Sequence, residues 1–213
     1  MKRFFFLLCL AALFLAETGS KTRATAQTAA NSTAPVYTAD GKLVLPAKYR
    51  EWIYLTTGLD MDYSPTVNLA EHSMFDNVFV NPEAYKAFLT TGTWPDKTIF
   101  VLEGRVAGSK GSINKGGHYQ TTEIMSRSIH LKDESRFPGK WAFFGFDEAT
   151  TGRQIPKEAV CYSCHAEHGA VDTTFVQFYP TLLEIARQKG TFSPGYLKDE
   201  AAASAADKKE SKN

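Results

Sequence analysis

The pattern of hydrophobic and polar positions divides the chain into a β-rich middle and helical flanks. β-branched and aromatic runs occupy residues 97–107, 118–130 and 140–146, and glycine-rich or Pro-Gly segments separate them. Such runs with turn residues between them predict antiparallel strands. The segment 108–118 is rich in glycine but lacks the glycine-lysine-serine order of a phosphate-binding loop, so we expect a mobile hairpin loop there.

Helices are predicted where a proline opens a segment and a glycine follows its end. Four segments have a proline at the start and a glycine directly after the end: 46–57, 82–91, 156–168 and 180–189. The predicted fold class is therefore α+β, a mainly antiparallel sheet flanked by helices. At 213 residues with 43% hydrophobic content, the chain can bury one sizeable core, so we expect one domain.

The N-terminal residues 1–26 resemble a signal peptide. Lys2 and Arg3 precede an apolar run at 4–16, and small residues favour cleavage after Ala26. The apolar run is too short to span a bilayer, although a short uncleaved anchor is an alternative. This pattern predicts a periplasmic protein with no membrane span after cleavage.

The remaining chain has polar ends around one domain. Residues 27–40 are small and polar, which predicts a flexible linker, and residues 198–213 are charged and alanine-rich, which predicts a disordered tail. The domain is then 41–197. Cleavage would change the formal net charge from +1 to −2, because four basic residues and one acidic residue are lost. Such a chain is no basic nucleic-acid binder.

After cleavage, Cys161 and Cys164 are the only cysteines of the chain, and His165 follows them directly. On a helix, residues three and four apart share a face. Both thiols could therefore reach the two vinyl groups of one porphyrin, while the imidazole of His165 binds the iron. Cys-x-x-Cys-His is the attachment signature of haem c. We expect one covalent haem c on a C-terminal helix, with His165 oriented by a hydrogen bond from its other ring nitrogen.

Two other chemistries use a similar cysteine spacing. Zinc could bind Cys161, Cys164, His165 and His168, but zinc sites draw their ligands from two segments rather than from one helix. A redox disulfide of the thioredoxin kind would need a βαβ unit, and the pattern shows none. Haem c remains the preferred interpretation.

A sixth iron ligand is not obvious in the sequence. An electron-transfer cytochrome c commonly uses a methionine from a late loop, and no methionine occupies such a position here. The methionines that remain are Met61, Met74 and Met125, and the other histidines, His72, His118 and His130, are placed in loops or at strand ends. The residues alone therefore leave the sixth position of the iron without an assigned ligand.

Several motifs beyond the haem signature resemble one family. They are LPAKYREW at 45–52, VNPEAY at 80–85, Thr91-Gly92, VLE at 101–103, WAF at 141–143, and FYP at 178–180 after the cysteine motif. Their order and spacing over residues 41 to 190 resemble the cytochrome P-460 family, which includes hydroxylamine-oxidising cytochromes and cytochromes c′-beta. The resemblance implies a mainly antiparallel β domain, a homodimer, and one five-coordinate haem with His165 below it and an open pocket above it.

The chain departs from the oxidases of that family at the positions that carry their chemistry. In those enzymes a strand lysine that precedes a glutamate is joined to the porphyrin, whereas here Leu102 precedes Glu103. The oxidases also have a carboxylate before the proline that opens the attachment helix, and here Ile155 stands there. A basic residue that lines the pocket of some members falls near Asp76.

The resemblance and the strand pattern together predict an apolar distal pocket. Phe100 shares a strand face with Leu102, and we expect both to face the porphyrin, together with Phe75, Phe144 and Ile155. Such a pocket suits an uncharged diatomic molecule, above all nitric oxide, and offers no base for oxidising hydroxylamine.

We therefore expect a gas-binding protein of the c′-beta type rather than an enzyme. The first alternative is a hydroxylamine or nitric oxide oxidoreductase, in which Asp76 is the distal base or Lys97 or Lys110 makes the cross-link. The second alternative is an electron carrier with Met74 or a histidine as the sixth ligand. Its periplasmic redox partner is not defined by the sequence.

Overall fold

The computed structural model describes residues 33–61, 73–146 and 150–210. The predicted signal peptide and its cleavage site lie outside the described residues, as does His72.

Seven strands form one sheet in which all neighbouring strands are antiparallel. Their order across the sheet is β1-β7-β6-β5-β4-β3-β2. The strands are β1 (Leu43–Val44), β2 (Ile53–Leu59), β3 (Met74–Val80), β4 (Ile99–Gly111), β5 (Gly117–Lys132), β6 (Trp141–Gly145) and β7 (Thr151–Gln154). The three predicted strands correspond to β4, β5 and β6, so the α+β class with an antiparallel sheet is confirmed.

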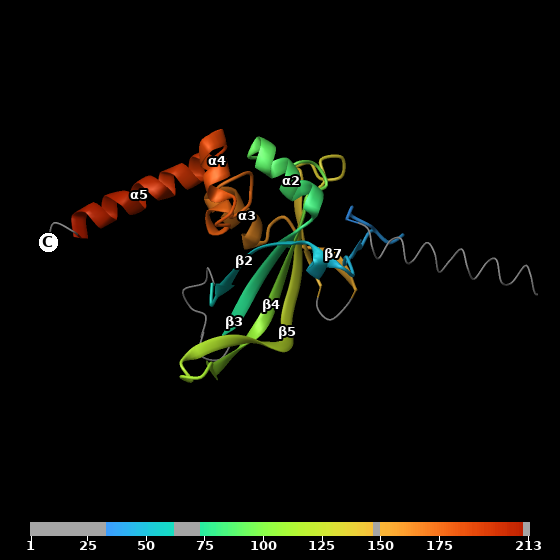
Figure 1. Ribbon diagram of the computed structural model, residues 1–213. Helices are drawn as coiled ribbons and strands as arrows, with labels where there is room; N and C mark the ends of the chain where they lie inside the picture. Colours follow the sequence, from blue (N-terminus) through green and yellow to red (C-terminus); the bar gives the residue numbers. More distant parts are fainter. Residues whose placement is uncertain (1–32, 62–72, 147–149, 211–213) are drawn as a thin grey trace, which may run out of the picture.

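The helices gather at one end of the sheet, and the β4–β5 hairpin forms the other end (Figure 1). They are α2 (Pro82–Thr91), α3 (Val160–His168), α4 (Leu183–Lys189) and α5 (Pro194–Glu210), with 3-10 turns η1 (Tyr49–Glu51) and η2 (Val176–Phe178). The bounds predicted for α2 are confirmed, and α3 and α4 begin a few residues later than predicted. No helix in the described ranges is long and apolar enough to cross a membrane.

Alternation along β4 sends its side chains into two different cores. Ile99 and Val101 pack on one face with Phe144 of β6, under the segment that carries η1. Phe100 points to the opposite face, where it packs with Trp94 and with the residues of the C-terminal helices. One central strand therefore supports both layers of the domain.

A buried carboxylate joins the η1 segment to β4. Glu103 is 2% exposed, and it accepts hydrogen bonds from the Tyr49 hydroxyl, from Arg50 and from Nε of Arg105. Burial acts to raise the pKa of Glu103, but these three donors outweigh it and hold the pKa below its ordinary value. Glu103 is therefore ionised in the folded protein at neutral pH.

The helix predicted at 46–57 is wrong. Only the 3-10 turn η1 forms there, and residues from Ile53 onward make strand β2, which pairs with β3. β-branched and aromatic residues in this stretch favour a strand, and pairing with β3 decides the outcome. Gly58, which resembled a helix stop, lies opposite Asp76 inside the sheet.

The described residues near the two ends of the chain include a docked segment and a helix. In the expected linker, the described part from residue 33 packs on the domain: the Tyr37 hydroxyl donates to Asp133 at 3.3 Å and the Arg136 guanidinium covers the Tyr37 ring. In the expected tail, α5 continues to Glu210, because its alanine-rich sequence has a high helix propensity.

The Glu103 cluster makes a testable prediction about stability and its pH dependence. Glu103→Gln removes the charge that Arg50 and Arg105 neutralise, and we expect it to lower the free energy of unfolding by about 2 kcal/mol at pH 7. Because the folded-state pKa of Glu103 is lowered, its contribution is lost as the pH falls through that value.

Urea unfolding of both proteins between pH 7 and pH 3 measures this effect. The difference between them should narrow at acidic pH, and Glu51→Gln, an exposed glutamate of the same segment, is the control. A difference that does not change with pH would show that the charge of Glu103 does not stabilise the fold.

Candidate functional site

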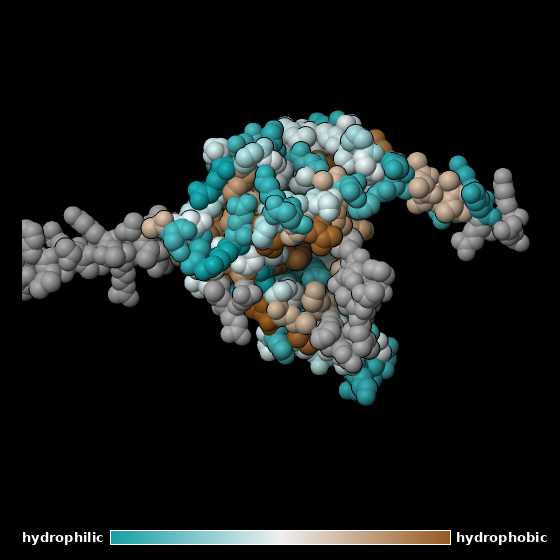
Figure 2. Space-filling model, turned by 180° about the vertical axis from the view of Figure 1, so that it is seen from behind, coloured by the Kyte–Doolittle hydropathy of each residue, from teal (hydrophilic) through white to brown (hydrophobic). Residues whose placement is uncertain are grey.

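A cavity lies on the sheet face opposite the η1 segment, between the strands and the chain that follows α3. Its empty space, including the open mouth, is about 800 Å³. From behind the view of Figure 1, hydrophobic side chains gather around a hollow in the middle of the molecule (Figure 2). The lining residues are Thr56, Gly58, Met61, Asp76, Val78, Phe100, Leu102, Ser128, His130, Phe143, His165, Thr174, Phe175, Phe178 and Tyr179.

The helix α3 carries the cysteine motif at the edge of this cavity. Cys161 and Cys164 are half-buried free thiols, and His165 lines the cavity. Tyr162 attaches the helix to the sheet, because its hydroxyl donates to Ile155 O at 3.0 Å and accepts from Phe143 N at 3.2 Å. The motif is thus held beside strand β6.

His165 has the geometry of a metal-ligating histidine. Its Nδ1 lies 2.7 Å from the Thr173 carbonyl oxygen, which fixes Nδ1 as the protonated nitrogen and leaves Nε2 for an iron ligand bond. Burial lowers the pKa of His165, while the bond to Thr173 acts in the opposite direction. The neutral imidazole that results is the form that binds metals.

Gly169 lets the turn with Thr173 approach the end of α3. A Cβ atom at Gly169 would lie 2.6 Å from the carbonyl oxygen of His165 and 2.8 Å from Thr174 N. Any other residue would push the turn away from the helix. The glycine that ends α3, which the sequence predicted as its stop, therefore also brings the Thr173 carbonyl to His165.

The other uses of the cysteine motif fit the structure less well. The Nδ1 atom of His168 lies 2.7 Å from Asp199 on α5, so His168 faces that helix. Burial raises the pKa of the Cys164 thiol, and Glu167 and Cys161 act in the same direction. A redox thiol needs a lowered pKa. The half-buried thiols and His165 beside an aromatic-walled cavity instead fit a covalently held haem.

The predicted pocket residues lie in two groups. Phe100 and Leu102 share the cavity face of β4, as predicted from strand alternation, and Asp76 of β3 lines the same cavity. Phe144 points into the core on the opposite face, and Phe75 alternates with Asp76 along β3. Ile155 is bound through its main chain to Phe143 and Tyr162. None of these three is among the lining residues.

The lysines and the methionine of the alternatives lie elsewhere. Lys97 forms an ion pair with Asp133 before β4 begins, and Lys110 lies near the tip of the β4–β5 hairpin. Neither lines the cavity, and neither does Met74, whereas Met61 does.

Sequence reasoning missed much of the cavity wall. His130 lies opposite Phe100 on β5, and Phe143 lies opposite His130 on β6. Once the strand register is known, side-chain alternation places His130 and Phe143 on the same sheet face as Phe100. The sequence does not give the register. Phe175, whose ring centroid is 4.3 Å from that of His165, comes from an irregular segment without periodicity.

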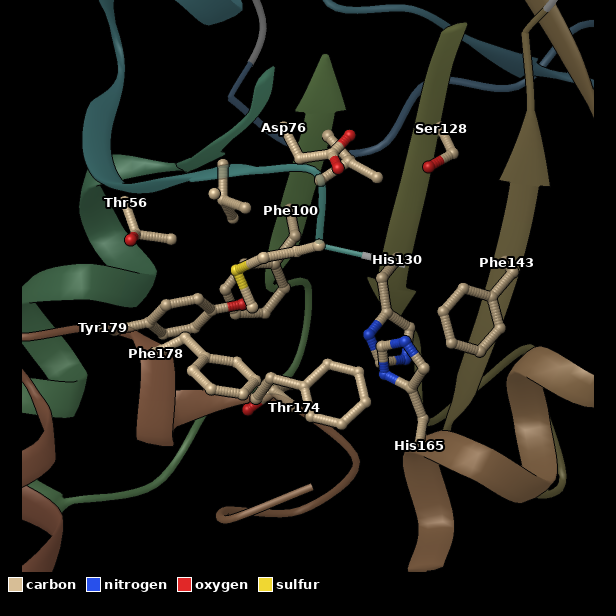
Figure 3. Close-up of a pocket in the computed structure, with 15 residues that line it drawn as sticks. Thr56, Asp76, Phe100, Ser128, His130, Phe143, His165, Thr174, Phe178 and Tyr179 are labelled. Carbon is tan, nitrogen blue, oxygen red and sulfur yellow. The ribbon is translucent and has the colours of Figure 1, made fainter. Parts of the chain in front are cut away.

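Polarity changes along the cavity. His130, His165 and Phe143 lie together at one end, and Asp76 and Ser128 lie at the other (Figure 3). In the sheet, Asp76 is opposite Gly104, and Gly104 is opposite Ser126. Asp76 and Ser128, which lies opposite Leu102 on β5, both line the cavity. The pocket is therefore not wholly apolar, although the sequence analysis predicted an apolar one.

Residues 46–176 match the family model described as cytochrome P460. This match covers more than half of the chain and contains the cysteine motif together with most of the cavity wall. No curated protein matches the chain.

Covalent attachment through α3 gives a direct prediction. The haem should stay on the protein after extraction with acid acetone, because two thioethers hold it. Cys161→Ala combined with Cys164→Ala should abolish stable haem loading after periplasmic expression, since His165 offers one coordinate bond. Ser163→Ala, an exposed change between the two cysteines, is the control and should load normally. Release of free haem from the unmodified protein would contradict this assignment.

Proposed function

The chain belongs to the cytochrome P460 family, and within it we propose a periplasmic protein that holds one haem c and binds nitric oxide. Cys161 and Cys164 would hold the porphyrin, and His165 would be the axial ligand through Nε2. The bound haem would supply an iron with an open coordination position for a diatomic gas.

The residue that carries this proposal is Leu102. The family includes hydroxylamine oxidoreductases and non-catalytic cytochromes c′-beta, and in the oxidases a lysine at the position of Leu102 would join the porphyrin. Leu102 faces the cavity beside Phe100, while the following Glu103 is turned into the opposite core. Among the cavity-lining residues in the described chain there is no lysine. An apolar side chain therefore stands where the oxidases have their cross-link.

The middle of the cavity favours an uncharged ligand. Val78 and Leu102 are neighbours across β3 and β4, and Phe175 and Phe178 close the opposite side. Apolar walls disfavour anions, because a charge buried there without a partner costs several kcal/mol. Nitric oxide needs no hydrogen bond and no proton transfer in order to bind.

Asp76 supports a second candidate function. Its carboxylate lines the cavity at the end away from His165 (Figure 3), and oxidation of hydroxylamine requires a base that removes protons. A hydroxylamine oxidoreductase without a cross-linked lysine would use Asp76 in this role. This candidate depends on one residue, whereas gas binding uses the whole apolar wall.

We also propose that the protein is exported and forms a homodimer. Haem c attachment follows export, which agrees with the signal peptide predicted at 1–26. The resemblance to the family favours a homodimer.

The absence of a lysine cross-link can be checked by mass spectrometry. Peptide maps of the holoprotein should show the porphyrin mass only on the peptide that contains Cys161, Cys164 and His165. Leu102→Lys, placed on the cavity face of β4, restores the lysine of the oxidases and serves as the comparison. A porphyrin-bearing peptide from another part of the unmodified protein would favour the oxidase instead.

Ligand binding and turnover separate the two functions. The ferrous protein should bind nitric oxide readily and oxidise hydroxylamine slowly, because the walls nearest to Leu102 offer no base. Leu102→Ala should speed nitric oxide entry by opening the cavity, and Leu197→Ala, an exposed leucine on α5, is the control. Stopped-flow spectroscopy measures the binding rate.

Hydroxylamine turnover by the unmodified protein at about 1 per second or faster would contradict gas binding as the main function. If this turnover falls at least tenfold in Asp76→Asn but not in Asp207→Asn, a matched change on exposed α5, Asp76 is the base and the second candidate replaces the first.

A further inference from the structure

The turn at residues 171–174 is fixed by its own hydrogen bonds. Val171 and Thr174 bond each other through their main chains in both directions, at 3.3 and 2.9 Å. The Thr174 hydroxyl donates to Val171 O and accepts from Nε1 of Trp94, both at 2.8 Å. The main chain on either side of Thr173 is thus tied to the domain core.

Thr173 itself contacts two histidines. Its carbonyl oxygen accepts the Nδ1 hydrogen of His165 at 2.7 Å. Its hydroxyl lies 3.3 Å from Nε2 of His130. Because a hydroxyl can both donate and accept, this contact suits either neutral tautomer of His130. One residue therefore connects the axial ligand with a histidine of the central sheet.

His130 is held rigidly in this contact. It is 7% exposed, and its ring stacks on Phe143 with centroids 4.0 Å apart and an interplanar angle of 10°. The edge-on ring of His165 lies 5.0 Å away, and Figure 3 shows the two imidazoles next to each other. A phenylalanine could fill this space, but it could not bond the Thr173 hydroxyl.

We propose that His130 is a positioning residue for the axial histidine, and that it acts through Thr173. Its Nε2 holds the Thr173 hydroxyl, so that the Thr173 carbonyl stays directed at Nδ1 of His165. Its ring blocks rotation of the His165 imidazole toward the sheet. This inference rests on the haem assignment in the proposed function, but not on the identity of the gas.

The expected consequence is electronic. A strong hydrogen bond at Nδ1 makes Nε2 a better donor to the metal, which favours ferric over ferrous iron. Loss of the bond from His130 removes one of the contacts that hold Thr173, so the hydrogen bond that its carbonyl accepts from His165 weakens and this effect is reduced. The ratio of ferric to ferrous protein at a fixed potential should then fall several-fold, up to about tenfold.

The experiment uses holoprotein with His130→Phe, which keeps the stacked ring, and with Thr173→Val, which removes only the hydroxyl. His118→Phe, an exposed histidine on the same strand, is the matched control. The readouts are the iron–histidine stretching frequency by resonance Raman and a redox titration. Both variants should lower the frequency and shift the ratio by similar amounts, and the double variant should shift it no further.

Additive shifts in the double variant would overturn the inference, as would a Raman frequency unchanged in both single variants. Equal shifts in His118→Phe would also overturn it. Thr173→Val keeps the test decisive if His130→Phe loads haem poorly. Nitric oxide titration of the unmodified protein tests the proposed function separately. No binding there, together with shifted frequencies in the variants, would reject the gas assignment and retain the role of His130.

Discussion

The carboxylate of Glu103 lies inside the protein behind β4, and it stays ionised there because Tyr49, Arg50 and Arg105 donate to it. This cluster fixes the 3-10 segment against the central strand and closes one core. With that face of β4 filled, alternation directs Phe100 and Leu102 to the other face. The position of the cavity wall thus depends on a charge that never contacts the cavity.

The two ends of the cavity are built by different means. At the end with His165, rings and hydrogen bonds come from β5, β6 and the turn at 171–174, and they leave the imidazole little freedom. At the end with Asp76, Gly104 lies between Asp76 and Ser126 without a side chain of its own. One end of the cavity is therefore walled by rings, and the other end carries the polar side chains of Asp76 and Ser128.

Sequence patterns predicted the parts of the fold that are locally encoded. Proline and glycine defined α2 to the residue, and they also placed Cys161, Cys164 and His165 on one helix. Alternation placed Phe100 and Leu102 on one face. Prediction failed where the outcome depended on non-local strand pairing. Residues from Ile53 form a strand beside β3 instead of a helix. Phe144 faces away from the cavity, whereas its neighbour Phe143 faces it. His130 could not be placed without the register of β5.

The cavity is lined by residues that span the chain from Thr56 to Tyr179. Such a site does not exist in any fragment, because its walls meet only after strands distant in sequence have paired. Sheets of this kind form slowly, since the entropy of closing long loops must be lost before the contacts form. The helix α3, which carries Cys161 and Cys164, is local by comparison, a single short segment without a fully buried side chain. A haem bonded to α3 would remain on the chain throughout that slow search, and it would be present to fill the cavity as the strands close around it.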